Sequence, residues 1–299
     1  DSLKVRMIGK LFNVVALNTM RKKSDLIIVN SKFVLKQCLA MLGKTHIDRI
    51  KVIPGGANTK IFFPVDNYEK KKIREKLKIP LNRTLFITAR GLKGRTGVDR
   101  LVEAASLLKE QGISYYLIIA GRGPLKQTIE RQIKSRGLES NIRLIYVKDE
   151  KELAVYYQAS DVFVLPTQGG EGFGLATVEA LASGLVVLGT NNGATTEILE
   201  KYNHRWLING TDKQSIYEKT LEQLKASALD VVVGHPEESA TQMGPLATRD
   251  QLGKVEDFVR SAEEEGARLV CGGNRLEGSP YGEGFYFAPT LFANARNYM

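Results

Sequence analysis

The sequence is short of cysteine, of histidine and of long apolar runs, and each shortage excludes a class of protein. Its two cysteines, Cys38 and Cys271, lie far apart without metal-type spacing, which excludes a disulfide framework and fits a reducing compartment. The three histidines are scattered and no Asp-x-Asp pair occurs, so no metal site is expected. No apolar run approaches the ~20 residues of a membrane span, and no signal-peptide pattern opens the chain. We therefore expect a globular protein of the cytoplasm.

Acidic residues are scarce over most of the chain and concentrate near its end. Residues 1–228 hold 37 Lys+Arg against 22 Asp+Glu, whereas residues 229–299 hold 6 against 11. A basic body suits nucleic acid, an anionic membrane face or diphosphate ligands, but ordinary solvated surface charge is the better explanation. We expect no nucleic-acid partner. A predicted helix over 3–20 has one apolar face, which could meet a core, a further domain or the inner face of a membrane in a peripheral contact.

From residue 84 onward, short apolar segments alternate with amphipathic ones. This alternation predicts an α/β fold with a Rossmann-like, doubly wound parallel sheet. Upstream, residues 25–64 have the pattern of a strand, a helix and an extended segment. The expected strands span 84–90, 115–120, 142–147, 161–165 and 185–189. The expected helices span 97–111, 123–136, 150–159, 174–183, 194–200 and 212–226, the last capped by Thr211 or Asp212.

Residues 161–184, DVFVLPTQGGEGFGLATVEALASG, are the most informative segment. An apolar strand enters a Gly-rich loop that opens directly into a helix, and the backbone amides at such a helix start attract phosphates. Glu179 falls on the buried stripe of this helix, together with Leu175 and Val178, where a carboxylate is costly unless a polar group meets it. It lies roughly 7–8 Å along the axis from the helix start. A nucleotide's diphosphate and ribose hydroxyls are about that far apart.

Glu171 and Glu179 form the pattern E-x7-E, which resembles the donor-site signature of retaining, nucleotide-sugar-dependent glycosyltransferases of the GT-B architecture, group 1 or family 4 type. The resemblance covers about residues 20–227 and rests on further segments in the family's order: RKKSDLIIVNS, VIPGGANTKIFFP, IIAGRGP, LASGLVVLGT and TEIL. It implies that residues 1–64 are a truncated remnant of the N-terminal domain with its hinge, and that residues 65–227 are the C-terminal, nucleotide-sugar-binding domain.

The resemblance also implies roles for individual residues. Glu179 would accept hydrogen bonds from the ribose hydroxyls, and Glu171 would contact a hydroxyl of the sugar. Catalysis would rest on Glu171, Arg90 and Arg95, the two arginines stabilising the departing diphosphate in place of a metal. Donor binding would involve Glu179, Phe173, Gly174, Leu175, Lys93 and Gly121. No cofactor is implied beyond the donor substrate, a UDP-, GDP- or ADP-type sugar, and the acceptor is not identified.

The loop after the first central strand departs from the family pattern. That pattern has an Arg at the strand end, followed five residues later by Lys and then Gly. When Gly97 is aligned with that Gly, the two cationic positions hold Gly91 and Thr96, and Arg90 and Arg95 each stand one place early. A shift of one residue could still deliver both cations to the ligand, or it could weaken the site.

Residues 228–299 carry sequence motifs of a different family from those of the preceding residues. The segments MGPLAT, EEGARLVCGG and GFYFAPTLF resemble an internal fragment of an NAD(P)-dependent aldehyde dehydrogenase. Neither that family's nucleophilic cysteine nor its general-base glutamate and cofactor motif is carried over, and Cys271 has the pattern of a small buried strand residue. We expect a loosely docked, unrelated α/β tail, with uncovered apolar side chains at Phe285, Tyr286, Phe287 and Leu291.

The sequence thus predicts a chimera of two pieces joined near residues 226–230. Its leading interpretation is a glycosyltransferase that transfers a sugar from a nucleotide-sugar donor with retention, this chain holding mainly the donor-binding half. One alternative is a nucleotide-binding fragment of a chimeric chain that turns nothing over. The other is an aldehyde dehydrogenase, named for the tail.

Overall fold

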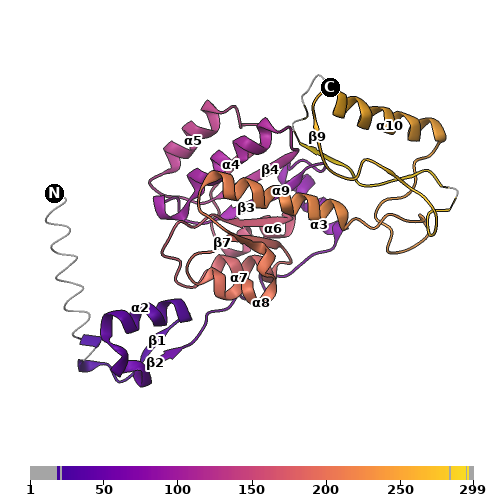
Figure 1. The fold of residues 1–299 in the computed structure, drawn as a ribbon. Coiled ribbons are helices and arrows are strands. Elements are labelled where there is room, and N and C mark those ends of the chain that lie inside the picture. The colour runs from indigo at the N-terminus through magenta and orange to yellow at the C-terminus, as the bar shows by residue number, and fades with distance from the viewer. Residues whose placement is uncertain (1–18, 21, 283, 294, 296–299) are drawn as a thin grey trace.

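The computed structural model describes residues 19–20, 22–282, 284–293 and 295, and its main body is a six-stranded parallel sheet (Figure 1). The order across the sheet is β5-β4-β3-β6-β7-β8, so the chain reverses direction across the sheet between β3 and β6. Ligands of open α/β sheets bind at that reversal. The strands are β3 (Thr84–Ala89), β4 (Tyr115–Ala120), β5 (Ile142–Ile145), β6 (Val162–Leu165), β7 (Val186–Thr190) and β8 (Leu207–Ile208). All five predicted strands are confirmed.

Helices cover both faces of this sheet (Figure 1), as the doubly wound prediction requires. One face packs against α4 (Val98–Glu110), α5 (Lys126–Ser135) and α9 (Lys213–Leu229). The other packs against α3 (Asn67–Leu77), α6 (Glu150–Ala159), α7 (Leu175–Ala182) and α8 (Thr195–Tyr202). Asp212 caps α9 by accepting from the amides of Gln214 and Ser215. Among the described residues, no helix combines the length and apolar character of a membrane span.

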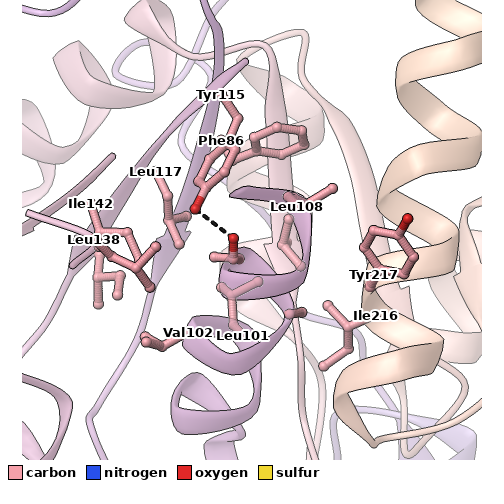
Figure 2. Packing of buried hydrophobic residues seen from close by; sticks show 14 of the residues in the cluster. Phe86, Leu101, Val102, Leu108, Tyr115, Leu117, Leu138, Ile142, Ile216 and Tyr217 are labelled. Atoms are coloured by element: carbon pink, nitrogen blue, oxygen red, sulfur yellow. Dashed lines mark hydrogen bonds between the residues drawn. The ribbon is translucent and has the colours of Figure 1, made fainter. Parts of the chain in front are cut away.

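The sheet is apolar on both sides because neighbouring strand residues point to opposite faces. Phe86 belongs to the cluster under α4, whereas Leu85 and Ile87 belong to the cluster under α6. Figure 2 shows α4 lying between the strands and α9, with Tyr115 reaching across to α4. The Tyr115 hydroxyl is buried there and donates a hydrogen bond of 2.6 Å to the carbonyl of Ala105.

A smaller unit precedes the sheet and lies beside α7 and α8 (Figure 1). It consists of β1 (Ile27–Val29), α2 (Lys32–Leu42), the short helix η1 (Lys44–Arg49) and β2 (Ile50–Val52), and its two strands are parallel. The predicted order of strand, helix and extended segment is confirmed. Residues 3–18 of the predicted N-terminal helix lie outside the described residues, so its membrane-facing alternative stays a prediction.

The tail contains α10 (Arg249–Glu264) and two short antiparallel pairs. The pairs are β9 (Arg268–Cys271) with β12 (Leu291–Ala293), and β10 (Arg275–Leu276) with β11 (Tyr286–Phe287). The prediction that Cys271 is a buried strand residue is confirmed. The expected uncovered apolar face is wrong at Tyr286 and Phe287, which are 4% and 7% exposed because they fold back over the tail's own loops.

The tail also contacts the core of the main body. Ala293 is fully buried within the cluster that α4 and α9 form, and Val270 and Leu291 pack against it. The backbone near Ala295 approaches Gly112 so closely that a Cβ at Gly112 would lie 2.1 Å from the Ala295 carbonyl oxygen. The β9–β12 pair is therefore packed against the main body and not loosely docked. By contrast, α10 leaves the Phe258 side chain 72% exposed.

Candidate functional site

The candidate site lies where β3 and β6 end, at the reversal of the strand order. Arg90 directly follows β3, and the loop with Glu171 follows β6. The Arg90 guanidinium donates to the Glu171 carboxylate at 3.0 Å and to the Thr167 hydroxyl at 2.7 Å. The two charged side chains are 8% and 19% exposed. The fold thus joins the first glutamate of the E-x7-E pattern to the predicted strand-end arginine.

Opposing influences act on the Arg90 guanidinium. Burial lowers the pKa of Arg90, while the Glu171 carboxylate raises it. Arginine titrates so far above neutral pH that the group stays charged. The cation is therefore held in place by a hydrogen-bonded carboxylate and is not a freely moving side chain.

The loop after β3 contributes a second cation to the same place. Arg95 lies in the short helix η2 (Gly94–Thr96) and donates to the carbonyl of Gly170 at 2.9 Å. Thr96 is buried, and its hydroxyl donates to the carbonyls of Gly91 and Lys93 at 2.8 and 2.6 Å. Thr96, which stands at the family's lysine position, thus stabilises the turn after β3 through its hydroxyl. Its neighbour Arg95 supplies the cation that contacts the Gly-rich loop.

Of the other predicted donor contacts after β3 and β4, Lys93 and Gly121 have different surroundings. Lys93 is exposed on the loop that carries Arg95. Gly121 directly follows β4 and lies so close to the end of β3 that a Cβ there would lie 2.0 Å from the Arg90 carbonyl oxygen. Only glycine fits, so Gly121 sets the spacing between the two strand ends.

The helix α7 opens at the same edge, with Gly174 as its N-cap. Gly174 has φ of +86°, a left-handed conformation that favours glycine, and it follows Phe173 directly. The first amides of a helix have no partner within it, and those of Gly174 and Leu175 belong to this helix start. Two fully buried hydroxyls, of Thr177 and Thr195, lie beside Gly174 and have no hydrogen-bond partner among the described residues.

Glu179 lies one turn further along α7 and is 8% exposed, so its predicted burial is confirmed. The prediction that Leu175 shares this buried stripe is wrong, because Leu175 in the first turn is 48% exposed. Burial raises the pKa of its carboxyl to about 7, and the nearby Glu150 adds to the rise. Tyr157 of α6 is fully buried close by, and its hydroxyl has no partner among the described residues. Burial raises the pKa of Tyr157 and Glu179 adds to the rise, whereas Arg90 lowers it. Sequence reasoning missed Tyr157 and Thr167, since neither belongs to a motif by spacing.

A cavity of about 220 Å³ opens next to this edge, beyond the ends of β4 and β5. Gly121, Arg122 and Tyr146 contribute to its lining, and the Arg122 guanidinium lies 5.5 Å from the centre of the Tyr146 ring. Tyr146 is exposed. Within the described ranges, no three His, Cys, Asp or Glu side chains gather closely enough to hold a metal ion.

Comparison with known proteins places the chain in a family. The model of the glycosyl transferases group 1 matches residues 69–235, more than half of the chain, and the chain belongs to this family. The model of the aldehyde dehydrogenase family matches residues 211–299, which overlap the first match along α9. The predicted resemblance to the group 1 glycosyltransferases is thereby confirmed.

Individual relatives agree with this placement. The chain is 27% identical over 191 residues to the amylovoran biosynthesis glycosyltransferase AmsK of Erwinia amylovora, covering 62% of this chain and 46% of that protein. It is 28% identical to the C-terminal domain of the group 1 protein LpcC from Francisella tularensis, with a TM-score of 0.50 and coverage of 57% and 89%.

The fold of the chain is also that of a larger solved structure. Alr3699/HepE of Anabaena, solved in complex with UDP-glucose, has a TM-score of 0.63, 19% identity and coverage of 71% of this chain and 57% of that one. The α/β parallel sheet is therefore that of the GT-B glycosyltransferases. The chain spans about half the length of the relatives AmsK and HepE.

Proposed function

We propose that this chain is the donor-binding half of a retaining glycosyltransferase. It would bind a UDP-, GDP- or ADP-type sugar in the domain of residues 65–227, and the longer protein would transfer the sugar to an acceptor. The observation that carries the proposal is the Arg90–Glu171 pair at the reversal of the strand order, beside the start of α7 and the buried Glu179. Cations and helix amides there suit the diphosphate of a nucleotide sugar, and the buried carboxylate suits its ribose hydroxyls.

Each part of the donor has a counterpart in this arrangement. The diphosphate would lie against the amides of Phe173, Gly174 and Leu175, within reach of Arg90 and Arg95. The ribose hydroxyls would donate to Glu179, which stabilises the charged form of that carboxyl. The cavity beside Gly121 lies on the same edge, and its planar Arg122 and Tyr146 groups suit stacking of the nucleobase.

The chemistry of transfer would follow from these contacts. Cleaving the bond between the sugar and the diphosphate leaves negative charge on the diphosphate oxygens. Arg90, Arg95 and the amides of α7 are preorganised to stabilise that charge, the role a metal plays in other transferases. Glu171 would orient the sugar through a hydroxyl while Arg90 holds its carboxylate. Retention of configuration is proposed from the family resemblance.

Two other functions compete with this proposal. A nucleotide-binding module without transfer would use the same contacts and differ only in turnover. Aldehyde oxidation is suggested by the match to residues 211–299. Against it, the sole cysteine of that segment, Cys271, is buried in β9 and offers no accessible nucleophile.

The test is the affinity of Glu179→Ala for UDP, GDP and ADP, measured by calorimetry. Losing a charged hydrogen-bond acceptor should weaken the nucleotide that binds by roughly 1.5–3 kcal/mol. The matched control is Glu200→Ala, which removes an exposed carboxylate from α8 and should leave affinity unchanged. Equal affinities for Glu179→Ala and the parent protein would refute the assignment.

A further inference from the structure

The N-terminus of α2 is capped by a residue from the other unit of the molecule. The backbone amides of Lys32 and Phe33 donate to the two carboxylate oxygens of Glu197, at 3.0 and 2.5 Å. Glu197 belongs to α8, more than 160 residues away along the chain. A carboxylate is stabilised at a helix start by the free amides and by the helix dipole. This contact therefore ties α2 to α8.

The local cap of α2 reaches the Gly-rich loop itself. The Ser31 hydroxyl accepts from the amide of Val34 at 3.1 Å, as an N-cap does. The same hydroxyl donates to the carbonyl of Gly172 at 2.5 Å. Gly172 stands between Glu171 and Phe173, so one hydroxyl fixes both the start of α2 and the backbone of the candidate donor loop.

Two further contacts close this arrangement. The amide of Ala194, which precedes α8, donates to the carbonyl of Glu171 at 3.0 Å. The Phe173 ring covers Gly55 so closely that a Cβ at Gly55 would lie 3.1 Å from a ring carbon. The loop of Glu171 and Phe173 is thus bonded on one side to α8 and on the other to the N-terminal unit.

We propose that Ser31 and Glu197 are positioning residues. Together they hold the start of α2 against the loop 171–174 and so fix the backbone of that loop. Glu197 holds the helix start, the helix start holds the Ser31 hydroxyl, and that hydroxyl holds the Gly172 carbonyl. The fastening keeps Glu171 in place to pair with Arg90 and keeps the first amides of α7 aligned. Nothing in this step depends on which nucleotide binds.

The proposed function adds a consequence. If a nucleotide diphosphate binds the amides of Phe173 and Gly174, the ordered loop holds Gly172 in place for Ser31. Linkage then requires that the nucleotide strengthen the α2 contact by the same factor by which the α2 contact strengthens nucleotide binding. This part rests on the proposed function, whereas the fastening of the loop does not.

The experiment is amide hydrogen exchange of the full chain without nucleotide, followed by mass spectrometry. Glu197→Ala removes the charged acceptor of the Lys32 and Phe33 amides, so it should accelerate exchange about tenfold or more over the helix start at residues 32–35. It should also accelerate exchange in residues 171–175. Glu197→Gln, which keeps an acceptor oxygen, should restore part of the protection. Glu200→Ala on the same helix should change neither segment. Faster exchange at 32–35 with an unchanged loop would overturn the proposal.

A second variant keeps the test valid if Glu197→Ala does not fold. Ser31→Ala removes the hydroxyl between α2 and the loop and should accelerate exchange at 171–175; unchanged exchange there would overturn the proposal. Calorimetry with UDP, GDP and ADP then separates the two hypotheses. Parent protein that binds none of them refutes the proposed function and leaves the exchange result standing. Binding that Glu197→Ala and Ser31→Ala leave unchanged refutes the positioning role.

Discussion

At the scale of single residues, the carboxyl of Glu179 has the clearest consequence. Its ordinary pKa is 4.5, and burial in α7 raises it to about 7. Between these two values the folded protein binds a proton that the unfolded chain has already released. The stability contributed by the protonated carboxyl is complete below about pH 4.5 and is lost as the pH rises through about 7.

Glu179→Gln should therefore stabilise the protein at high pH only. The neutral amide has no desolvated charge, so we expect the variant to exceed the parent by about 1–3 kcal/mol in free energy of unfolding at pH 8. The difference should shrink toward pH 5. Urea unfolding of both proteins across this range measures it. A difference that stays constant over the range would mean that the carboxyl does not titrate as proposed.

The sequence identified the charged residues of the site but did not show how they pair. Glu171, Glu179 and Arg90 were predicted from a motif and from a strand end. That Arg90 binds Glu171 and Thr167 depends on β3 and β6 being neighbours, which is a tertiary fact. The roles of these residues in donor binding remain predictions.

At the scale of helices and strands, the hydrophobic pattern sufficed for the main body because the central strands β3, β4, β6 and β7 are buried on both faces and the helices beside them on one. It missed β8, whose two residues are too few to show a period. The pattern also did not predict that Tyr286 and Phe287 are buried. They are paired in a two-residue strand with residues 275–276, and a strand this short leaves no periodic signal.

One buried arginine joins α3 to the sheet. The Arg74 guanidinium donates to the Ala159 carbonyl and to the Asp161 carboxylate, both at 2.7 Å. Arg74→Ala would remove the hydrogen-bond donor of the Ala159 carbonyl and one of the cations that pair with Asp161. The free energy of unfolding should therefore fall by roughly 2–3 kcal/mol. Chemical denaturation checks this, with Lys71→Ala, an exposed change on α3, as control. Equal losses for both variants would contradict it.

At the scale of the whole molecule, the question is whether the tail belongs to the folded unit. Deleting residues 230–299 keeps α9 complete and uncovers the core beside Ala293. We predict a less stable protein that still folds and binds nucleotide with affinity within about threefold of the parent, because no tail residue lies among the site contacts described above. Circular dichroism and calorimetry test this. An unfolded product would show that the two pieces are one cooperative unit.

The central claim is that a nucleoside diphosphate binds at the start of α7 through arginines and amides, without a metal. Calorimetric titration of the full chain with UDP, GDP and ADP, in EDTA and at two salt concentrations, tests it most directly. We predict that at least one nucleotide binds equally well with and without EDTA and more weakly at high salt, since salt screens the arginines. Binding that EDTA abolishes, or no binding of any of the three by folded protein, would contradict the account.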